Sequence, residues 1–174
     1  MNSVIKYGVI IGVVGIAMQA ILYSISVKLM LGDGSVVAAL IALGLYIYFG
    51  LKARKDNGGY FTFGEAFKSI MTMILIAGVL SSTFQAILYK VIDPSIEIEV
   101  KDKAVELTES IIDFFNVPEE QADEMLAQAE EQDYRMTWSS LIKNFLILSV
   151  GFGGILSLII ALSIKKRDPN SLDY

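Results

Sequence analysis

The sequence contains neither cysteine nor histidine among its 174 residues. Without cysteine the chain forms no disulfide and has no thiol nucleophile. Because zinc in proteins is usually bound by cysteine and histidine, the usual zinc ligands are missing as well. Imidazole, the side chain best suited to moving protons near neutral pH, is absent too. The net charge of −5 offers no basic surface to a nucleic acid. We therefore expect no catalytic residues, no metal, no cofactor and no nucleic-acid partner, and a protein that is not an enzyme.

Acidic residues are missing from four long apolar stretches, at about 8–31, 36–52, 69–92 and 141–164. A bilayer core of about 30 Å requires about 20 apolar residues in helical form. Charge is penalised at that depth, and proton relays and ion-coupled transporters usually carry an acid there. The pattern predicts an all-α integral membrane protein, a four-helix bundle. Its second span is the shortest and needs Ser35 or Lys52, or a locally thinner bilayer, to complete the crossing.

Turn and cap signals separate the spans. Gly32-Asp33-Gly34-Ser35 predicts a turn with positive φ angles, and Asn57-Gly58-Gly59 predicts a break after the second span. Thr62 and Glu65 have the spacing of a capping box, so a helix is expected to begin there, with residues 62–68 at the interface. Asp93-Pro94 ends it. Spans 1 to 3 thus occupy residues 1–94, and residues 138–174 hold span 4 and a basic tail.

The segment 95–137 differs from the rest of the chain in charge. From Asp93 to Thr137 there are 14 acidic and three basic residues. Apolar residues at helical spacing predict an amphipathic helix over 102–116, and Pro118 predicts the first turn of a second helix. This acidic helical hairpin is too small to bury a core of its own. Its apolar stripe is the candidate partner-binding surface: Leu107, Ile111, Ile112 and Phe115.

Basic residues predict the orientation of the spans. The clusters Lys52/Arg54/Lys55 and Lys165/Lys166/Arg167 fall on the same side of a four-span protein. Lys and Arg in short loops remain in the cytoplasm. We expect an inner-membrane protein with both termini cytoplasmic and the acidic segment 95–137 in the periplasm.

Small residues recur at helical spacing in the first and last spans. Gly8, Gly12 and Gly15 share one helix face, and Gly151 and Gly154 share another. Such faces allow two helix backbones to approach closely. Packing inside the bundle is the favoured explanation, because any bundle needs close contacts, and an interface with another subunit is the alternative.

A pentapeptide occurs twice. Gln-Ala-Ile-Leu-Tyr begins at Gln19 in the first span and again at Gln85 in the third. One interpretation is a duplicated helical hairpin that brings the two glutamines together as a polar pair, as in parallel-repeat transporters. The other is a coincidence between two apolar helices.

The stretch Tyr60-Phe61-Thr62-Phe63-Gly64-Glu65-Ala66-Phe67-Lys68, followed by a span ending in Tyr89-Lys90-Val91-Ile92-Asp93-Pro94, resembles a known family. It is the domain of unknown function numbered 4199, small four-span membrane proteins found mainly in Bacteroidota. The resemblance covers almost the whole chain. It implies the architecture and an inner-membrane location, and it brings no activity and no catalytic residues.

Two functions fit these features best; a membrane enzyme, which would have to use the extracytoplasmic carboxylates, fits them least. The first is a non-enzymatic accessory or assembly subunit of a cell-envelope complex, bound to a membrane or periplasmic protein. The second is a small channel or transporter, which four short helices could form only as a homo-oligomer. In either case the lipid bilayer is a partner.

Overall fold

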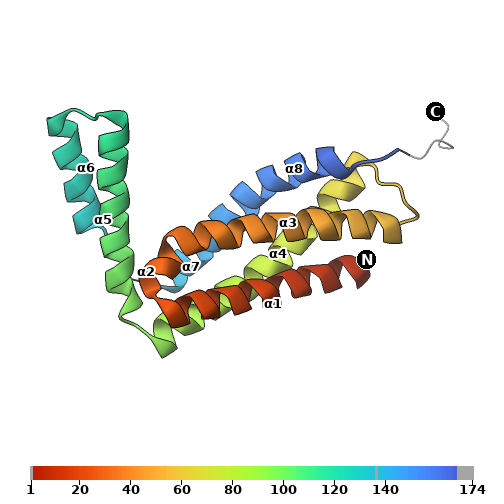
Figure 1. Ribbon diagram of the computed structural model, residues 1–174, viewed down its shortest axis with the longest axis horizontal. Coiled ribbons are helices and arrows are strands. Elements are labelled where there is room, and N and C mark those ends of the chain that lie inside the picture. The colour runs from red at the N-terminus through yellow and green to blue at the C-terminus, as the bar shows by residue number, and fades with distance from the viewer. Residues whose placement is uncertain (1, 136, 168–174) are drawn as a thin grey trace.

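The computed structural model describes residues 2–135 and 137–167. Four of its helical segments are long and apolar enough to cross a membrane: Ser3–Ile25, Asp33–Asp56, Phe63–Ile92 and Trp138–Ile164. They lie alongside one another as a bundle, with an extra pair of helices at one end (Figure 1). The predicted all-α four-helix membrane fold is confirmed.

The elements follow the chain in a simple order. The bundle contains α1 (Asn2–Ile25), the short α2 (Val27–Leu31), α3 (Asp33–Asp56), and α4 (Phe63–Ile87) continued by the π-helical η1 (Leu88–Ile92). The hairpin consists of α5 (Ile96–Phe115) and α6 (Glu119–Glu131). The last span is built from α7 (Trp138–Phe145), the π-helical η2 (Leu146–Phe152) and α8 (Gly153–Ile164).

The first two spans differ from the sequence prediction at their junction. The first helix begins at Asn2 and breaks at Ser26, whose φ of −169° and ψ of 137° are extended. The predicted turn is present at Gly32, where the Ser35 amide donates to the Gly32 carbonyl at 2.9 Å, but the φ of Gly32 is −105° and α3 already begins at Asp33. Gly34 is needed for close approach, since a Cβ there would lie 2.5 Å from the backbone carbonyl oxygen of Leu29. Starting at Asp33 gives α3 24 residues, or about 36 Å at the helical rise, so the helix includes both Ser35 and Lys52 beyond the apolar run.

Other local predictions are confirmed. Gly58 and Gly59 have φ values of 84° and 89°, as the break after the second span requires. Thr62 Oγ1 accepts a hydrogen bond from the Glu65 amide while the Glu65 carboxylate accepts one from the Thr62 amide, so the capping box is present. The hairpin also forms, but α5 begins at Ile96, six residues before the predicted start.

The bundle is organised around α4. Its buried face carries Ile70, Met73 and Ile74, which pack with Tyr7 and Ile11 of α1 and with residues of α3 and α8 in one apolar cluster. Most other apolar side chains of the spans are exposed. In water such a surface would be unstable, whereas lipid chains solvate it without penalty.

Polar contacts hold the end of the bundle that carries the N-terminus and the α3–α4 loop. The Tyr7 hydroxyl donates to Asp56 at 2.6 Å, and Arg54 donates to the carbonyl of Ile164 at 2.9 Å. Phe61 and Lys166 exchange two backbone hydrogen bonds, of 2.9 and 2.8 Å. These contacts place the described end of the last span beside the α3–α4 loop.

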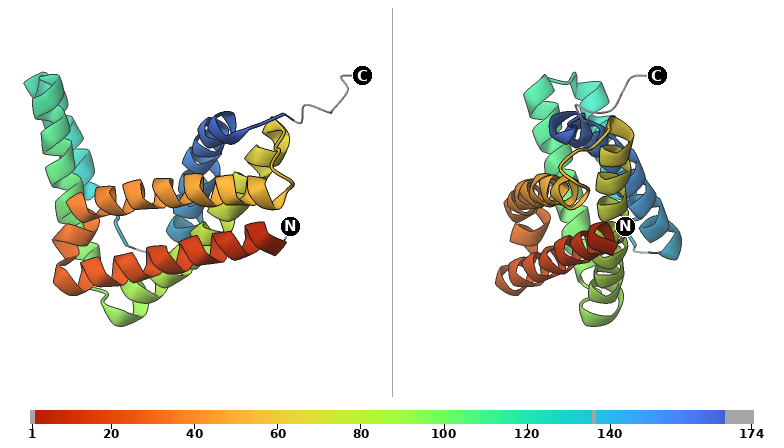
Figure 2. Two further views of the ribbon diagram at one scale, coloured as in Figure 1. Left: turned by 45° about the vertical axis from the view of Figure 1, so that its right-hand side comes forward. Right: turned by 90° about the vertical axis from the view of Figure 1, so that its right-hand side faces the viewer.

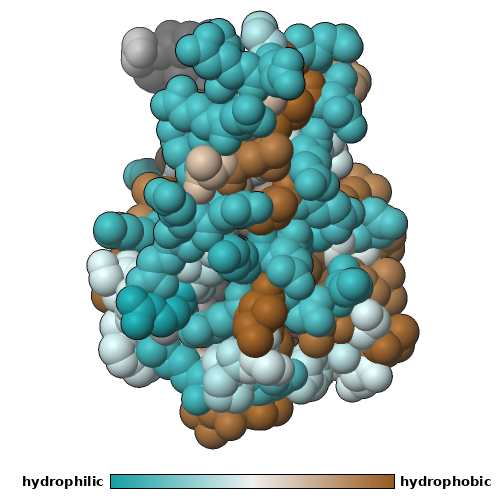
Figure 3. Space-filling view, turned by 90° about the vertical axis from the view of Figure 1, so that its left-hand side faces the viewer, coloured by the Kyte–Doolittle hydropathy of each residue, from teal (hydrophilic) through white to brown (hydrophobic). Residues whose placement is uncertain are grey.

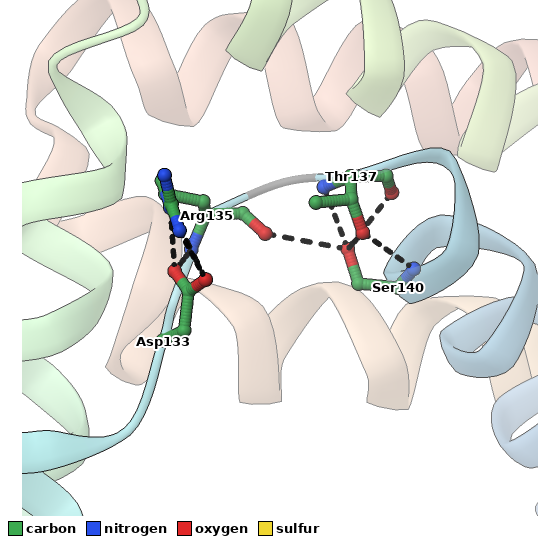
Figure 4. A network of polar contacts seen from close by, with 4 residues as sticks. All are labelled: Asp133, Arg135, Thr137 and Ser140. Carbon is green, nitrogen blue, oxygen red and sulfur yellow. Dashed lines mark hydrogen bonds and ion pairs between the residues drawn. The ribbon is translucent and has the colours of Figure 1, made fainter.

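The hairpin lies across the opposite end of the bundle. In Figures 1 and 2, α5 and α6 run roughly crosswise to α1 and α3, and the turn between them projects past the helix ends. Ile96, at the start of α5, is fully buried with Met30, Leu88 and Tyr89. The chain leaves α6 through Asp133 and Arg135, which form an ion pair, and enters α7 through a reciprocal cap between Thr137 and Ser140 (Figure 4).

Candidate interaction surfaces

A groove of about 400 Å³ runs between α4 and α7 on the surface of the bundle. One wall is a single face of α4 and η1, and the other is the first two turns of α7. The lining residues are Val79, Ser82, Thr83, Ala86, Ile87, Lys90, Val91, Trp138, Leu141, Ile142 and Phe145. The α4 positions recur at three- and four-residue intervals, so they form one continuous stripe along the helix.

The floor of this α4–α7 groove is made of small side chains. Ser82 and Ala86 are one turn apart, and the Thr83 hydroxyl donates back to the Val79 carbonyl at 2.8 Å. Its polar group is therefore satisfied within the helix, as hydroxyls in membrane helices commonly are. At the mouth, the Lys90 ammonium lies 5.1 Å from the centroid of the Trp138 ring. The groove was not predicted from the sequence, although the spacing of Ser82 and Ala86 was a signal for it.

The predicted partner-binding residues of the hairpin do not all share one surface. Leu107, Ile111 and Phe115 are exposed, whereas Ile112 is half-buried. Phe114, which was not predicted from the sequence, is 79% exposed and stacks edge-to-face on Phe115 with centroids 5.0 Å apart. The spacing of 107, 111 and 114 could have identified it.

The two sets of glycines have different surroundings. A Cβ at Gly8 would lie 3.1 Å from the Met73 Cα, and one at Gly12 would lie 3.2 Å from the Ala77 Cα. With Gly15 beside Ser81, these glycines form the contact between α1 and α4 inside the bundle. Gly151 and Gly154, in contrast, have no neighbouring atom within 4 Å of the point that a Cβ would occupy. The close contacts of the last span involve Gly153, against Ile74, and Gly78 of α4, against Ser149.

The two glutamines of the repeated pentapeptide lie at the same level of the bundle. Gly15 contacts Ser81, and each of these residues is one turn before its glutamine on two helices that run in the same direction. The repeat is therefore in register across the α1–α4 interface. The Gln85 amide donates to the Tyr89 hydroxyl at 3.4 Å, and Gln19 lines a cavity of about 210 Å³ with Ser35 and Ser81.

Asp93 ties the hairpin to the bundle. Its carboxylate accepts hydrogen bonds from the side chain and the amide of Ser95, and one from the Tyr23 hydroxyl at 3.0 Å. The Ser95 hydroxyl is the main reason that the pKa of Asp93 is below its ordinary value, with Tyr23 adding to the effect. In the part of the chain that the structure describes, no group of three or more acidic side chains is arranged to hold a metal ion.

The architecture defines a multi-pass integral membrane protein with an extramembrane helical hairpin between its third and fourth spans. No curated protein and no solved structure matches the chain. The family described as protein of unknown function DUF4199 matches residues 6–166, and the chain belongs to this family.

Proposed function

We propose that the protein is a non-enzymatic accessory subunit of a membrane complex, and that the α4–α7 groove receives a transmembrane helix of another protein. The observation that carries this proposal is the uncovered stripe of α4 from Val79 to Val91, with small residues at its centre. The twelve helical steps from Val79 to Val91 extend about 18 Å, which is more than half the thickness of a bilayer core. Small side chains on such a stripe allow a second backbone to approach closely, which is how membrane helices associate in the absence of a hydrophobic driving force.

The outer mouth of the groove supports the same occupant. The Lys90 ammonium and the Trp138 ring form a cation–π pair, at the level where a partner helix would leave the membrane. A cation held over an aromatic ring and an indole at the interface both fix the depth of a helix. Binding a partner helix in this groove requires no catalytic side chain, and the chain contains neither histidine nor cysteine.

Photo-crosslinking in the native membrane tests this proposal with a matched pair of positions. Ile87 lines the groove, and Ile21 is its counterpart in the other copy of the pentapeptide, at the same depth but outside the groove. A photoreactive residue at Ile87 should crosslink to one protein in stoichiometric yield, and the same residue at Ile21 should not. Ala86→Trp, which fills the floor of the groove, should abolish that crosslink. Crosslinks to lipid alone at both positions would refute the proposal.

We place the protein in the inner membrane, with both termini in the cytoplasm and the hairpin in the periplasm. The support is the two basic clusters, which the structure brings to one end of the bundle through the Arg54 and Lys166 contacts. A reporter that is active only in the cytoplasm, inserted at residue 120 in the α5–α6 hairpin, should be inactive. Activity there would reverse the orientation.

A small oligomeric channel or transporter is the second candidate. The cavity lined by Gln19, Ser35 and Ser81 favours it, because polar side chains inside the membrane can line a solute or ion pathway. Ion or solute flux into vesicles containing the purified protein, lost in Gln19→Leu, would support this function over the first.

A further inference from the structure

Helix α5 has three distinct faces. At 100° per residue, Ile96, Val100, Leu107, Ile111 and Phe114 fall within an arc of about 60°. The acidic residues Asp102, Glu106, Glu109 and Asp113 fall within a second arc of similar width, well separated from the first. Between them, on the third side, Val105, Thr108 and Ile112 are half-buried. The apolar arc is therefore distinct from the contact with α6.

The first half of the apolar arc is already an interface. Ile96 is fully buried among Met30, Leu88 and Tyr89, and Val100 packs against the same cluster. Lys103 follows on the edge of this face, with its Cε 3.6 Å from the position of a Cβ on Gly32. This face of α5 consequently points at the end of the bundle.

The second half of the same arc is much more exposed than the first. Leu107, Ile111 and Phe114 are 52%, 45% and 79% exposed. Figures 1 and 2 show the reason: α5 continues crosswise past the ends of the spans, so its outer turns extend beyond the edge of the bundle. Around a bundle that spans a membrane, the space beyond that edge is filled by lipid.

We propose that the outer half of the hairpin rests on the bilayer surface, with Leu107, Ile111 and Phe114 inserted among the lipid headgroups and upper acyl chains. The apolar arc is continuous with the interface between α5 and the bundle, so the helix cannot dock on the bundle without presenting these side chains to the membrane. Phe115, edge-to-face on Phe114, widens the inserted end of the helix.

The distribution of charge fits a lipid surface. The carboxylates of Asp102, Glu106, Glu109 and Asp113 are kept off the apolar arc, and Glu106 pairs with Lys103 at 2.7 Å. Viewed from the side away from the bundle, the hairpin is mostly hydrophilic (Figure 3). A polar outer face with an apolar inner face is the arrangement of helices that lie in the plane of a membrane. The binding comes from apolar insertion, because α5 has two basic residues, Lys101 and Lys103, against six acidic ones, and its charge does not attract anionic lipids.

Spin labels on single cysteines provide a direct test, because the chain has no cysteine of its own. The full chain with Phe114→Cys or Asp113→Cys is labelled and reconstituted in phosphatidylcholine vesicles. These neighbours are both exposed but lie on different arcs of α5. The label at position 114 should be several-fold more accessible to oxygen, which concentrates in lipid, than to a water-soluble nickel chelate, and the label at position 113 should show the reverse.

Each other outcome overturns the proposal. Free access of the nickel chelate to position 114 would mean that the arc is in water. Protection of position 114 from both reagents would mean that protein covers it, either a second copy or a neighbouring segment. In a further variant, Leu107→Ser with Ile111→Ser, the label at position 114 should become several-fold more accessible to the nickel chelate, and an unchanged value would show that the stripe does not hold the helix on the membrane.

Discussion

The contact between α1 and α4 leads to a sharp prediction about Gly8. A Cβ added there would lie 3.0 Å from Ile76 Cβ, 3.1 Å from Met73 Cα and 3.2 Å from Met73 O. Two of these atoms are backbone and the third is attached directly to it, so no side-chain rotation relieves the crowding. The two helices must move apart by a few tenths of an ångström to accept Gly8→Ala.

The size of the effect follows from two opposing terms. Overpacking of a close contact costs about 1–3 kcal/mol. Replacing glycine by alanine inside a helix gains about 1 kcal/mol from the lower entropy of the unfolded backbone. Lipid chains are as apolar as the added methyl group, so burial adds nothing. We expect Gly8→Ala to destabilise the protein by about 1 kcal/mol.

Gly44→Ala is the matched control. Gly44 lies inside α3, and no atom lies within 4 Å of the position that its Cβ would occupy. Only the gain from replacing glycine by alanine in a helix therefore applies there. The difference between the two variants isolates the overpacking term, about 1–3 kcal/mol in favour of Gly44→Ala. Reversible unfolding in mixed detergent and dodecyl sulfate micelles, followed by circular dichroism, measures both. If Gly8→Ala were as stable as Gly44→Ala, the α1–α4 contact would not be as close as the structure shows.

Two further predictions concern single polar contacts. Thr62→Ala removes the cap of α4 and should destabilise the protein by about 0.5–2 kcal/mol in the same unfolding assay. The control Thr72→Ala should have little effect, because the Thr72 hydroxyl only donates back to Lys68 O. Equal losses of stability in the two variants would contradict the role of the cap. The Arg135 side chain, and after it the Arg135 backbone amide, lower the pKa of Asp133 from 3.8 to about 2. Since the folded pKa is the lower one, the ion pair contributes above about pH 4 and is lost as the pH falls toward 2. An NMR titration of the Asp133 carboxyl carbon should show this value. Arg135→Ala should raise the pKa toward 3.8, although the backbone amide at position 135 still donates to the carboxylate. A native midpoint near 3.8 would refute the pair.

The spans and the caps could be read from the sequence because their causes are local. A bilayer excludes charge over a fixed thickness, so four acid-free stretches are enough to predict four crossings. The capping box at Thr62 and Glu65 uses two residues of the same turn, and the glycines at 58 and 59 meet a requirement of their own backbone. In the same way, helical spacing within 102–116 was sufficient to predict an amphipathic helix in the acidic segment.

The groove between α4 and α7, and the direction in which the apolar stripe of α5 faces, could not be predicted from the sequence, since each depends on which helices become neighbours. Gly8 and Gly151 have the same local chemistry, but the first lies against α4 and the second faces open space. The stripe from Val79 to Val91 is a groove only because α7 stands beside it.

The sequence by itself determined the class of protein, the number of spans and the existence of an acidic hairpin, because hydropathy and capping act within a helix or between a helix and its solvent. Only the tertiary structure decided the direction of that hairpin. The burial of Ile96 beneath Leu88 and Tyr89 fixes the rotation of α5, and that rotation turns Leu107, Ile111 and Phe114 toward the membrane and the carboxylates away from it.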